Sequence, residues 1–447
     1  MGAVVAAPPR VVPLLALWLV AACHGGEDAR PARQAAGRAV GSAAAGSAAV
    51  AVAAPTWYRA TVGEGSQEVP FFLSTPPPGS VGACQVANGD ERIAVRCRWE
   101  GDALEAEFLQ FATRIRARRS EGGALAGGWF PSHQSGLDAP IAFAATPVPA
   151  LDPRARFPQV AGARPAVDVT GTWETQHQSF GLGKGVFAQT PDGVVTGTLI
   201  PTDVGDLRYL AGNVVDHTLW LSTFDGQHAY VLHAEVAAAG SATAATLAGV
   251  WTYSHILDDP FTGRRVATLD VGRLESLRLR AGATRVTLPQ LGEPAFAGKP
   301  VIVDFSGTWC PACMDETPFL VDLYRRYHPR GLEILTVSLE ATEEPAVNAK
   351  QVAYFREHFG IPWRIDILPG ELTETEALLP PELENTGGFP ITLFINRDGT
   401  VADLHSGFYG PAAPAEHAAL KRRFEASVER ILTSPPPVVA PSPSSAR

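Results

Sequence analysis

Residues 301–313 of the chain read VIVDFSGTWCPAC. The first five residues form a short β-rich apolar run of the kind found in buried parallel strands. A helical stretch follows Cys310 and continues to Tyr327. Cys310 is therefore predicted at a helix N-terminus, where unpaired backbone N–H groups and the helix dipole stabilise a thiolate. With two residues between them, Cys313 is close enough to attack a mixed disulfide formed on Cys310.

The segments that follow continue an alternation of strands and helices. Apolar β-rich runs and helical patterns succeed one another along the C-terminal third of the chain. We predict strands at 332–338, 391–395 and 400–404, and helices at 311–327, 345–359 and 415–432. This order is typical of an α/β domain with a mixed sheet, which we place at residues 283–433.

Other uses of a Cys-x-x-Cys pair fit this sequence less well. A zinc knuckle needs two further Cys or His ligands at suitable spacing, and the sequence contains no second such pair. Covalent haem attachment needs a histidine where Met314 stands. A peroxidatic cysteine usually has Thr or Ser three residues earlier, whereas Gly307 occupies that position. These comparisons favour a redox-active dithiol with no metal or organic cofactor.

Three motifs carry a resemblance to a known family. In chain order they are KPVIVDF leading into WCPAC (299–313), ETP (316–318) and GFPITLFI (388–395). Together they make residues 286–432 similar to the thioredoxin-fold domain of the TlpA/ResA group of extracytoplasmic thiol-disulfide oxidoreductases, which includes bacterial lipoproteins. The resemblance covers about one third of the chain and implies a thioredoxin-like fold and a catalytic Cys310–Cys313 pair.

The resemblance also assigns roles to residues around the dithiol. Pro390 matches the family's cis-proline, which turns the backbone of Phe389 toward the dithiol so that it can pair with an extended substrate. A trans proline at the start of a strand is the alternative. Trp309 and Pro311 would complete the substrate-binding surface.

Two carboxyl groups are candidates for proton transfer. Glu316 matches the family's acidic residue after the second cysteine, and Asp304 matches the buried aspartate of thioredoxins. The alternative for Asp304 is a solvated position at the end of its strand.

One departure from the family suggests the direction of electron flow. Met314 and Asp315 stand where relatives often carry a basic residue, so the thiolate lacks a nearby cation. A less stabilised thiolate goes with a more reducing couple. We therefore expect a reductase of protein disulfides that receives its electrons from a membrane-embedded thiol donor, as in the family.

The first 54 residues indicate export and tethering. Residues 1–22 combine a short basic segment with an apolar run too short to span a bilayer, as in a signal peptide. The run closes with VAAC (20–23), which resembles the lipobox of bacterial lipoproteins, where Cys23 carries the lipid. An ordinary signal with a chance cysteine is the alternative. Residues 23–54 are a flexible tether, and we expect a lipid-anchored protein of the bacterial periplasm or cell envelope.

Cys84 and Cys97 remain from the five cysteines of the chain. They flank Asn88-Gly89-Asp90, a strong reverse-turn signal, and both lie in strand-like sequence. A structural disulfide that joins two antiparallel strands is expected, with two free buried thiols as the alternative.

Residues 55–282 have the pattern of an all-β region. Short alternating or β-branched runs are separated by Gly, Asp and Pro, which suits a sandwich or a small barrel. GALAGGW (123–129) resembles ATLAGVW (245–251) at a constant offset, so we expect two related modules, although small-residue coincidence is an alternative. The boundaries we predict are 55–135 for the first module, 136–168 for a Pro-rich crossing and 169–282 for the second. The Pro- and Ser-rich tail at 434–447 should be disordered.

Composition limits the remaining functions. Of the 447 residues, 46% are hydrophobic and 18% are charged, which indicates globular domains. The net charge of −10 argues against nucleic acid as a partner. We interpret six tryptophans of the β region as core residues. His228 and His233, on one predicted strand, should point to opposite faces and so cannot share a metal. The rival function is a binding protein whose dithiol binds copper or is vestigial.

Overall fold

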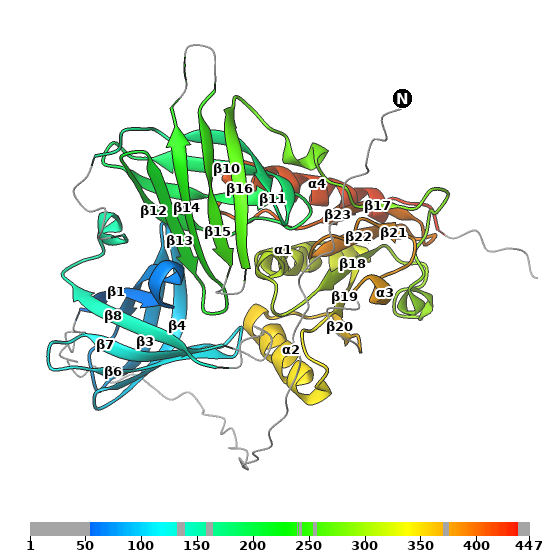
Figure 1. The fold of residues 1–447 in the computed structure, drawn as a ribbon. Helices are drawn as coiled ribbons and strands as arrows, with labels where there is room; N and C mark the ends of the chain where they lie inside the picture. The colour runs from blue at the N-terminus through cyan, green and yellow to red at the C-terminus, as the bar shows by residue number, and fades with distance from the viewer. Residues whose placement is uncertain are drawn as a thin grey trace, which may run out of the picture.

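The computed structural model describes residues 54–131, 139–157, 164–238, 240, 244–253, 257–369 and 375–436. Within them the chain forms two closed eight-stranded barrels, followed by a domain with a five-stranded sheet. Figure 1 shows the blue-to-cyan first barrel and the green second barrel beside the yellow-to-red C-terminal domain. The signal peptide, Cys23, residues 23–53 of the predicted tether and residues 437–447 of the tail lie outside the described residues.

The first barrel is an up-and-down meander that closes when its first and last strands pair. Its strands are β1 (Thr56–Val62), β2 (Val69–Thr75), β3 (Val81–Asn88), β4 (Glu91–Glu100), β5 (Ala103–Phe108), β6 (Thr113–Arg119), β7 (Leu125–Phe130) and β8 (Ile141–Val148). Alternation decides which face is inside. In β6, Ile115 and Ala117 are buried while Arg114, Arg116 and Arg118 are exposed. Closure leaves no open sheet edge, which explains why a barrel forms from these short strands.

The second barrel repeats the same plan. Its strands are β9 (Gly171–His177), β10 (Gly181–Gln189), β11 (Val194–Pro201), β12 (Leu210–Val215), β13 (Thr218–Phe224), β14 (Ala229–Ala237), β15 (Thr246–Tyr253) and β16 (Leu257–Val266). β7 and β15, which contain the two similar motifs, are both the seventh strand of their barrel. Trp129 and Trp251 are buried in them. The fold class predicted from the sequence, two related β modules before an α/β domain, is confirmed.

The boundary of the first module differs from the prediction. β8 completes the first barrel, although we expected residues 136–168 to form a crossing outside it. The strand reads IAFAATPV, and its small alanines and Pro147 made it look like linker sequence. Pro147 is tolerated because the pairing of β8 with β7 ends at Ala145, whereas its pairing with β1 continues to Val148.

The C-terminal domain has a mixed sheet in the order β20-β19-β18-β22-β23. Its strands are β18 (Val301–Ser306), β19 (Glu333–Ser338), β20 (Arg364–Ile367), β22 (Ile391–Ile395) and β23 (Val401–Ser406), and its helices are α1 (Pro311–Tyr327), α2 (Pro345–Phe359), α3 (Thr375–Leu378) and α4 (Pro414–Leu432). β17 (Arg278–Leu279) pairs with β21 (Leu383–Glu384) beside this sheet. β18 is parallel to β19, antiparallel to β22 and buried at every position, as its apolar sequence predicted.

The hairpin between β13 and β14 joins the two barrels. Its tip enters the first barrel, where the Phe224 ring stacks on Phe71 with ring centroids 4.4 Å apart. The carbonyl of Gly226 accepts hydrogen bonds from Trp129 Nε1 at 2.9 Å and Thr113 Oγ1 at 2.6 Å. Buried Arg156 adds hydrogen bonds to both barrels, to the carbonyl of Ala87 and to Ser222 Oγ.

Both barrels also contact the C-terminal domain. Gln351 of α2 donates to the carbonyl of Gln110 in the first barrel, and Lys184 of β10 pairs with Glu416 of α4. No helix among the described residues is long and apolar enough to cross a membrane.

Candidate active site

The candidate site is the Cys310–Cys313 disulfide at the start of α1. Cys310 is the N-cap residue of the helix, and Pro311 occupies the first helical position, where its missing N–H costs no hydrogen bond. The two Cα atoms are 5.3 Å apart. The backbone N–H of Cys313 donates to Cys310 Sγ over 3.1 Å. The helix start therefore presents a donor to the sulfur on which a thiolate would form.

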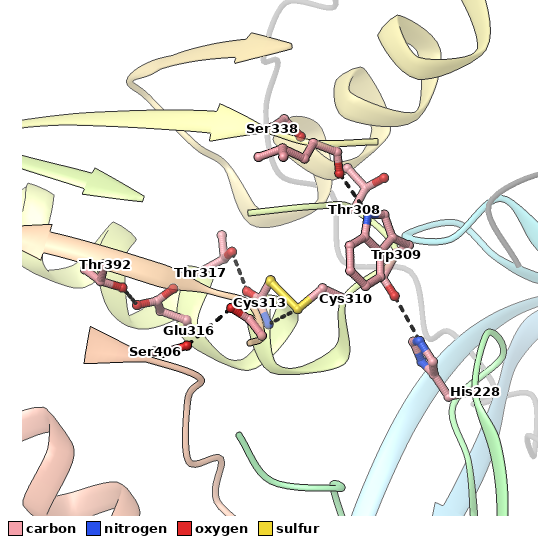
Figure 2. Close-up of a disulfide and its surroundings, with 12 residues drawn as sticks. His228, Thr308, Trp309, Cys310, Cys313, Glu316, Thr317, Ser338, Thr392 and Ser406 are labelled. Atoms are coloured by element: carbon pink, nitrogen blue, oxygen red, sulfur yellow. Dashed lines mark hydrogen bonds between the residues drawn. A yellow bond between two sulfur atoms is a disulfide. The ribbon is translucent and has the colours of Figure 1, made fainter. Parts of the chain in front are cut away.

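The residue before the disulfide is held by three contacts. Trp309 donates from its ring Nε1 to the carbonyl of Leu339 at 2.8 Å. Its ring also meets the Phe389 ring edge to face, with centroids 5.8 Å apart. Its carbonyl lies 2.9 Å from His228 Nε2, which reaches the site from the second barrel, as Figure 2 shows.

The Phe389–Pro390 peptide bond is cis. It lies between β21 and β22, and the contact of Phe389 with Trp309 brings this loop to the disulfide. The structure thus gathers Trp309, Cys310, Phe389 and Pro390 at one place, although they come from two separate parts of the sequence.

Asp304 and Glu316 lie together in the interior of the domain. Asp304 is 3% exposed and Glu316 is 1% exposed. Thr336 donates to Asp304 Oδ2 at 2.9 Å, and Thr392 donates to Glu316 Oε1 at 2.6 Å (Figure 2 shows Glu316 with Thr392). Asp304 and Thr392 are direct partners on neighbouring strands, so the residue that Glu316 contacts lies beside Asp304.

Burial controls the charge of both groups. It raises the pKa of Asp304 to about 7. Burial and the neighbouring Asp304 charge also raise the pKa of Glu316 well above its usual range. Asp304 Oδ1 has no hydrogen-bond partner among the described residues, so this oxygen is available for a proton. A solvated position for Asp304, the alternative left open by the sequence, is wrong.

A cation reaches the start of α1 from another part of the chain. Arg208, between β11 and β12, lies 3.2 Å from Asp315 Oδ1 and 2.6 Å from Glu91 Oε1 of the first barrel. Burial raises the pKa of Asp315 to about 6, and Arg208 opposes that rise. The expectation of a helix start without a nearby cation is therefore wrong, because the second barrel supplies Arg208. Its charge is compensated by Asp315 and Glu91, so it leaves no net positive charge to stabilise a thiolate, and the argument for a reducing couple stands.

His228 is a functional candidate that the sequence reasoning missed. We expected it on a strand, but it lies in the turn before β14. Its Nδ1 is 2.9 Å from Asp225 Oδ2, so its two ring nitrogens face a carboxylate and a carbonyl. These two contacts fix the orientation of the ring between the second barrel and the start of α1. Burial opposes ionisation of Asp225, but His228 and Arg208 lower its pKa to about 2.

The second cysteine pair is separate from this site. Cys84 of β3 and Cys97 of β4 form a disulfide with a Cα–Cα distance of 5.6 Å. It joins antiparallel neighbours within the first barrel. Among the described residues no group of three or more His, Cys, Asp or Glu side chains could hold a metal ion.

The fold and the site together define a thioredoxin-fold domain with a redox-type Cys-x-x-Cys. Residues 281–404 match the AhpC/TSA family. The chain is 32% identical over 112 residues to the thiol-disulfide oxidoreductase ResA of Geobacillus kaustophilus, covering 25% of this chain and 57% of that protein. It is 29% identical over 107 residues to ResA of Bacillus thuringiensis subsp. konkukian, covering 24% of this chain and 54% of the relative. These matches confirm the resemblance that the three motifs predicted.

A solved structure also matches part of the chain. It is a thiol:disulfide interchange protein of the thioredoxin family from Chlorobium tepidum, with 24% identity and a TM-score of 0.23, covering 30% of this chain and 81% of that one. The chain spans a little over half of the length of the curated ResA relatives it matches.

Proposed function

We propose that this protein is a membrane-tethered, extracytoplasmic thiol-disulfide oxidoreductase that reduces disulfides of other proteins. The observation that carries the proposal is the Cys310–Cys313 disulfide at a helix N-terminus, with Cys313 N–H directed at Cys310 Sγ. The similarity to ResA proteins over this domain supports the same chemistry.

The reaction uses the two sulfurs in turn. The Cys310 thiolate attacks one sulfur of a client disulfide, forming a mixed disulfide and releasing a client thiolate. Cys313 then attacks Cys310 Sγ, which releases the second client thiolate and closes the Cys310–Cys313 bond. Two electrons pass from the dithiol to the client, and a membrane thiol donor returns two electrons to the protein.

The buried carboxyl pair serves the second step. Cys313 must lose its proton before it attacks, and that proton needs an acceptor in a site without bulk water. Asp304, with its pKa raised to about 7, is partly ionised near neutral pH and can accept it. Burial and the Asp304 charge raise the pKa of Glu316 well above its usual range, which disfavours a second negative charge on the pair.

The location rests on sequence features and on the second disulfide. A stable Cys84–Cys97 bond fits an oxidising compartment outside the cytoplasm. The lipobox-like VAAC ending at Cys23 supports a lipid anchor. Both are consistent with delivery of electrons by a membrane thiol donor.

Two cysteine variants test the activity. Cys310→Ser should abolish reduction of insulin disulfides, because the attacking sulfur is missing. Cys313→Ser should accumulate mixed disulfides with client proteins, since the resolving step is blocked. Unchanged insulin reduction in Cys310→Ser would contradict the proposal and favour a binding protein with a vestigial dithiol.

The potential of the couple tests the direction of electron flow. We expect a reduction potential at the reducing end of the known range, about −270 mV as in thioredoxin. A reduction potential of about −120 mV would instead make the protein an oxidant of client thiols. Peroxide consumption above that of free dithiol would favour a peroxidase, but Gly307 supplies no hydroxyl at the position where such enzymes carry one.

A further inference from the structure

The active-site disulfide is covered in this structure. Cys310 is 3% exposed, Ala312 is 2% exposed and Cys313 is fully buried. A protein disulfide must place its own sulfur in line with Cys310 Sγ for exchange to occur. Burial of this degree leaves no room for that approach, so the question is which part of the chain covers the site.

One segment that packs against the dithiol motif is Asp203–Asp206, in the loop between β11 and β12 of the second barrel. Its backbone runs beside the loop that follows β23. The N–H of Asp206 donates to the carbonyl of Phe408 at 3.1 Å, and Ser406 Oγ donates to the carbonyl of Asp203 at 2.9 Å. The N–H of Gly410 in turn donates to Asp206 Oδ2 at 3.0 Å. One backbone–backbone hydrogen bond and two side-chain hydrogen bonds therefore fix the segment against this loop.

Three glycines allow the backbones to approach closely. A Cβ atom built on Gly205 would lie 2.8 Å from Ala312 Cβ, between the two cysteines, and 2.6 Å from the carbonyl oxygen of Phe408. A Cβ on Gly388 would overlap the carbonyl of Asp203, and one on Gly407 would overlap the nitrogen of Gly205. The segment therefore touches the dithiol motif, the approach to the cis-proline and the loop after β23.

We propose that Asp203–Asp206 occupies, within the same chain, the groove that the extended backbone of a client protein takes during disulfide exchange. This inference rests on the proposed function and adds its regulation: the structure is the closed state, and the segment must leave before a protein disulfide reaches Cys310. Gly205 is the residue of the segment that lies against Ala312.

Contacts with other elements hold the loop between β11 and β12 in its conformation. Asp203 and Arg208 have left-handed backbone conformations, with φ of 64° and 56°, which non-glycine residues adopt at a cost. The contacts that keep them there come from other elements. Asp203 accepts from Ser276 in the segment between the second barrel and the C-terminal domain, and Arg208 pairs with Asp315 of α1. Release of the docked loop relieves this backbone strain, which favours a reversible contact.

Gly205→Ala tests the proposal in the full-length protein. The added methyl collides with Ala312 and Phe408 and should displace the segment while leaving both cysteines unchanged. We expect about tenfold faster reduction of insulin disulfides than in the wild type, because a larger fraction of molecules is open. Gly181→Ala is the matched control, since Gly181 is also a positive-φ glycine of the second barrel but a Cβ there meets nothing within 4 Å.

A chemical probe measures closure without relying on activity. The reduced protein is treated with N-ethylmaleimide or with a maleimide that carries a long polyethylene glycol chain, and labelling of Cys310 is followed by peptide mapping. The wild type and Gly181→Ala should react slowly with the large reagent relative to the small one. In Gly205→Ala, the labelling rate with the large reagent divided by that with the small reagent should rise about fivefold or more.

The outcomes separate this inference from the proposed function. Equal insulin rates and equal labelling ratios in Gly205→Ala and the wild type would overturn the closed state, even if the protein is active. A raised labelling ratio with no insulin reduction in any variant would instead overturn the proposed activity and keep the closure. If Gly205→Ala fails to fold, Ser406→Ala replaces it, because it removes the hydrogen bond to Asp203 without adding an atom. It should raise both readouts, and no rise in either would overturn the closed state.

Discussion

Asp304 is a carboxyl group in a strand whose every residue is buried. The sequence identified it as a candidate proton acceptor by its match to the buried aspartate of thioredoxins. Its protonation could not be predicted in this way, because the pKa depends on burial and on Glu316, which approaches it from α1. The hydrogen bond that it accepts from Thr336 does not offset the cost of burying a charge.

The raised pKa of Asp304 predicts a pH-dependent stability. In the unfolded chain the Asp304 carboxyl has a pKa of about 3.9, whereas in the folded protein it holds its proton up to about pH 7. Between these values the folded state binds more protons, so the free energy of unfolding falls as pH rises. Asp304→Asn should remove this fall and be more stable than the wild type at about pH 8, by on the order of 3 kcal/mol.

Denaturant unfolding at acidic and alkaline pH measures this effect. Asp322→Asn is the control, because Asp322 also belongs to the C-terminal domain but its side chain is 57% exposed. Equal pH dependence in Asp304→Asn and the wild type would show that Asp304 is ionised at neutral pH in the folded protein.

At the scale of elements, the hairpin between β13 and β14 links the barrels to each other and to the active site. Phe224 at one end of its turn packs on Phe71, Phe108 and Trp129 inside the first barrel. His228 at the other end contacts the carbonyl of Trp309. Alternation and β-branching predicted both strands, but nothing in their sequence specified that the turn enters another barrel.

Phe224→Ala should therefore destabilise the protein well beyond its own strand. Removal of a fully buried ring costs about 3–5 kcal/mol, and the space it leaves is surrounded by rings that cannot all close in. Thermal and denaturant unfolding measure the loss. Leu182→Ala, at a leucine of the second barrel that is 45% exposed, should change the stability by about 0.5 kcal/mol or less. Similar losses in the two variants would mean that the hairpin is not anchored in the first barrel.

At the scale of the whole molecule, Arg208 lies where the two barrels and the C-terminal domain meet. It pairs with Glu91 of the first barrel, Asp225 of the second and Asp315 of the C-terminal domain. Near it, burial and Asp315 raise the pKa of Asp206 to about 8. One guanidinium thus compensates carboxyl groups from both barrels and from the C-terminal domain. Its contribution to the free energy of unfolding therefore depends on how many of these carboxyl groups are ionised.

Arg208→Ala should weaken the assembly most at alkaline pH. At about pH 8 Asp315, whose pKa is about 6, is ionised and loses its cation, so we expect a loss of about 3–5 kcal/mol in unfolding free energy. At about pH 5 Asp315 is protonated and the loss should be smaller. Arg264→Ala, which removes an exposed partner of Glu174, should cost about 0.5 kcal/mol or less at both pH values. An equal loss at both pH values in Arg208→Ala would exclude Asp315 as the group that needs the cation.

The sequence alone determined the features that depend on neighbouring residues. Periodicity predicted α1, α2, β18 and the β-rich region, and the position of Cys310 between a strand and a helix predicted the redox site. These are local properties, because hydrogen bonding and burial within an element depend on residues a few positions apart.

Tertiary structure decided which segment packs over that site and which charged groups lie near it. Asp203–Asp206 and His228 lie about a hundred residues before Cys310, in loops without a sequence pattern of their own, and only closure of the second barrel brings them to the dithiol. Arg208 likewise supplies a cation that the start of α1 lacks in its own sequence. Contacts of this kind depend on how complete domains pack against each other, so no window of sequence contains them.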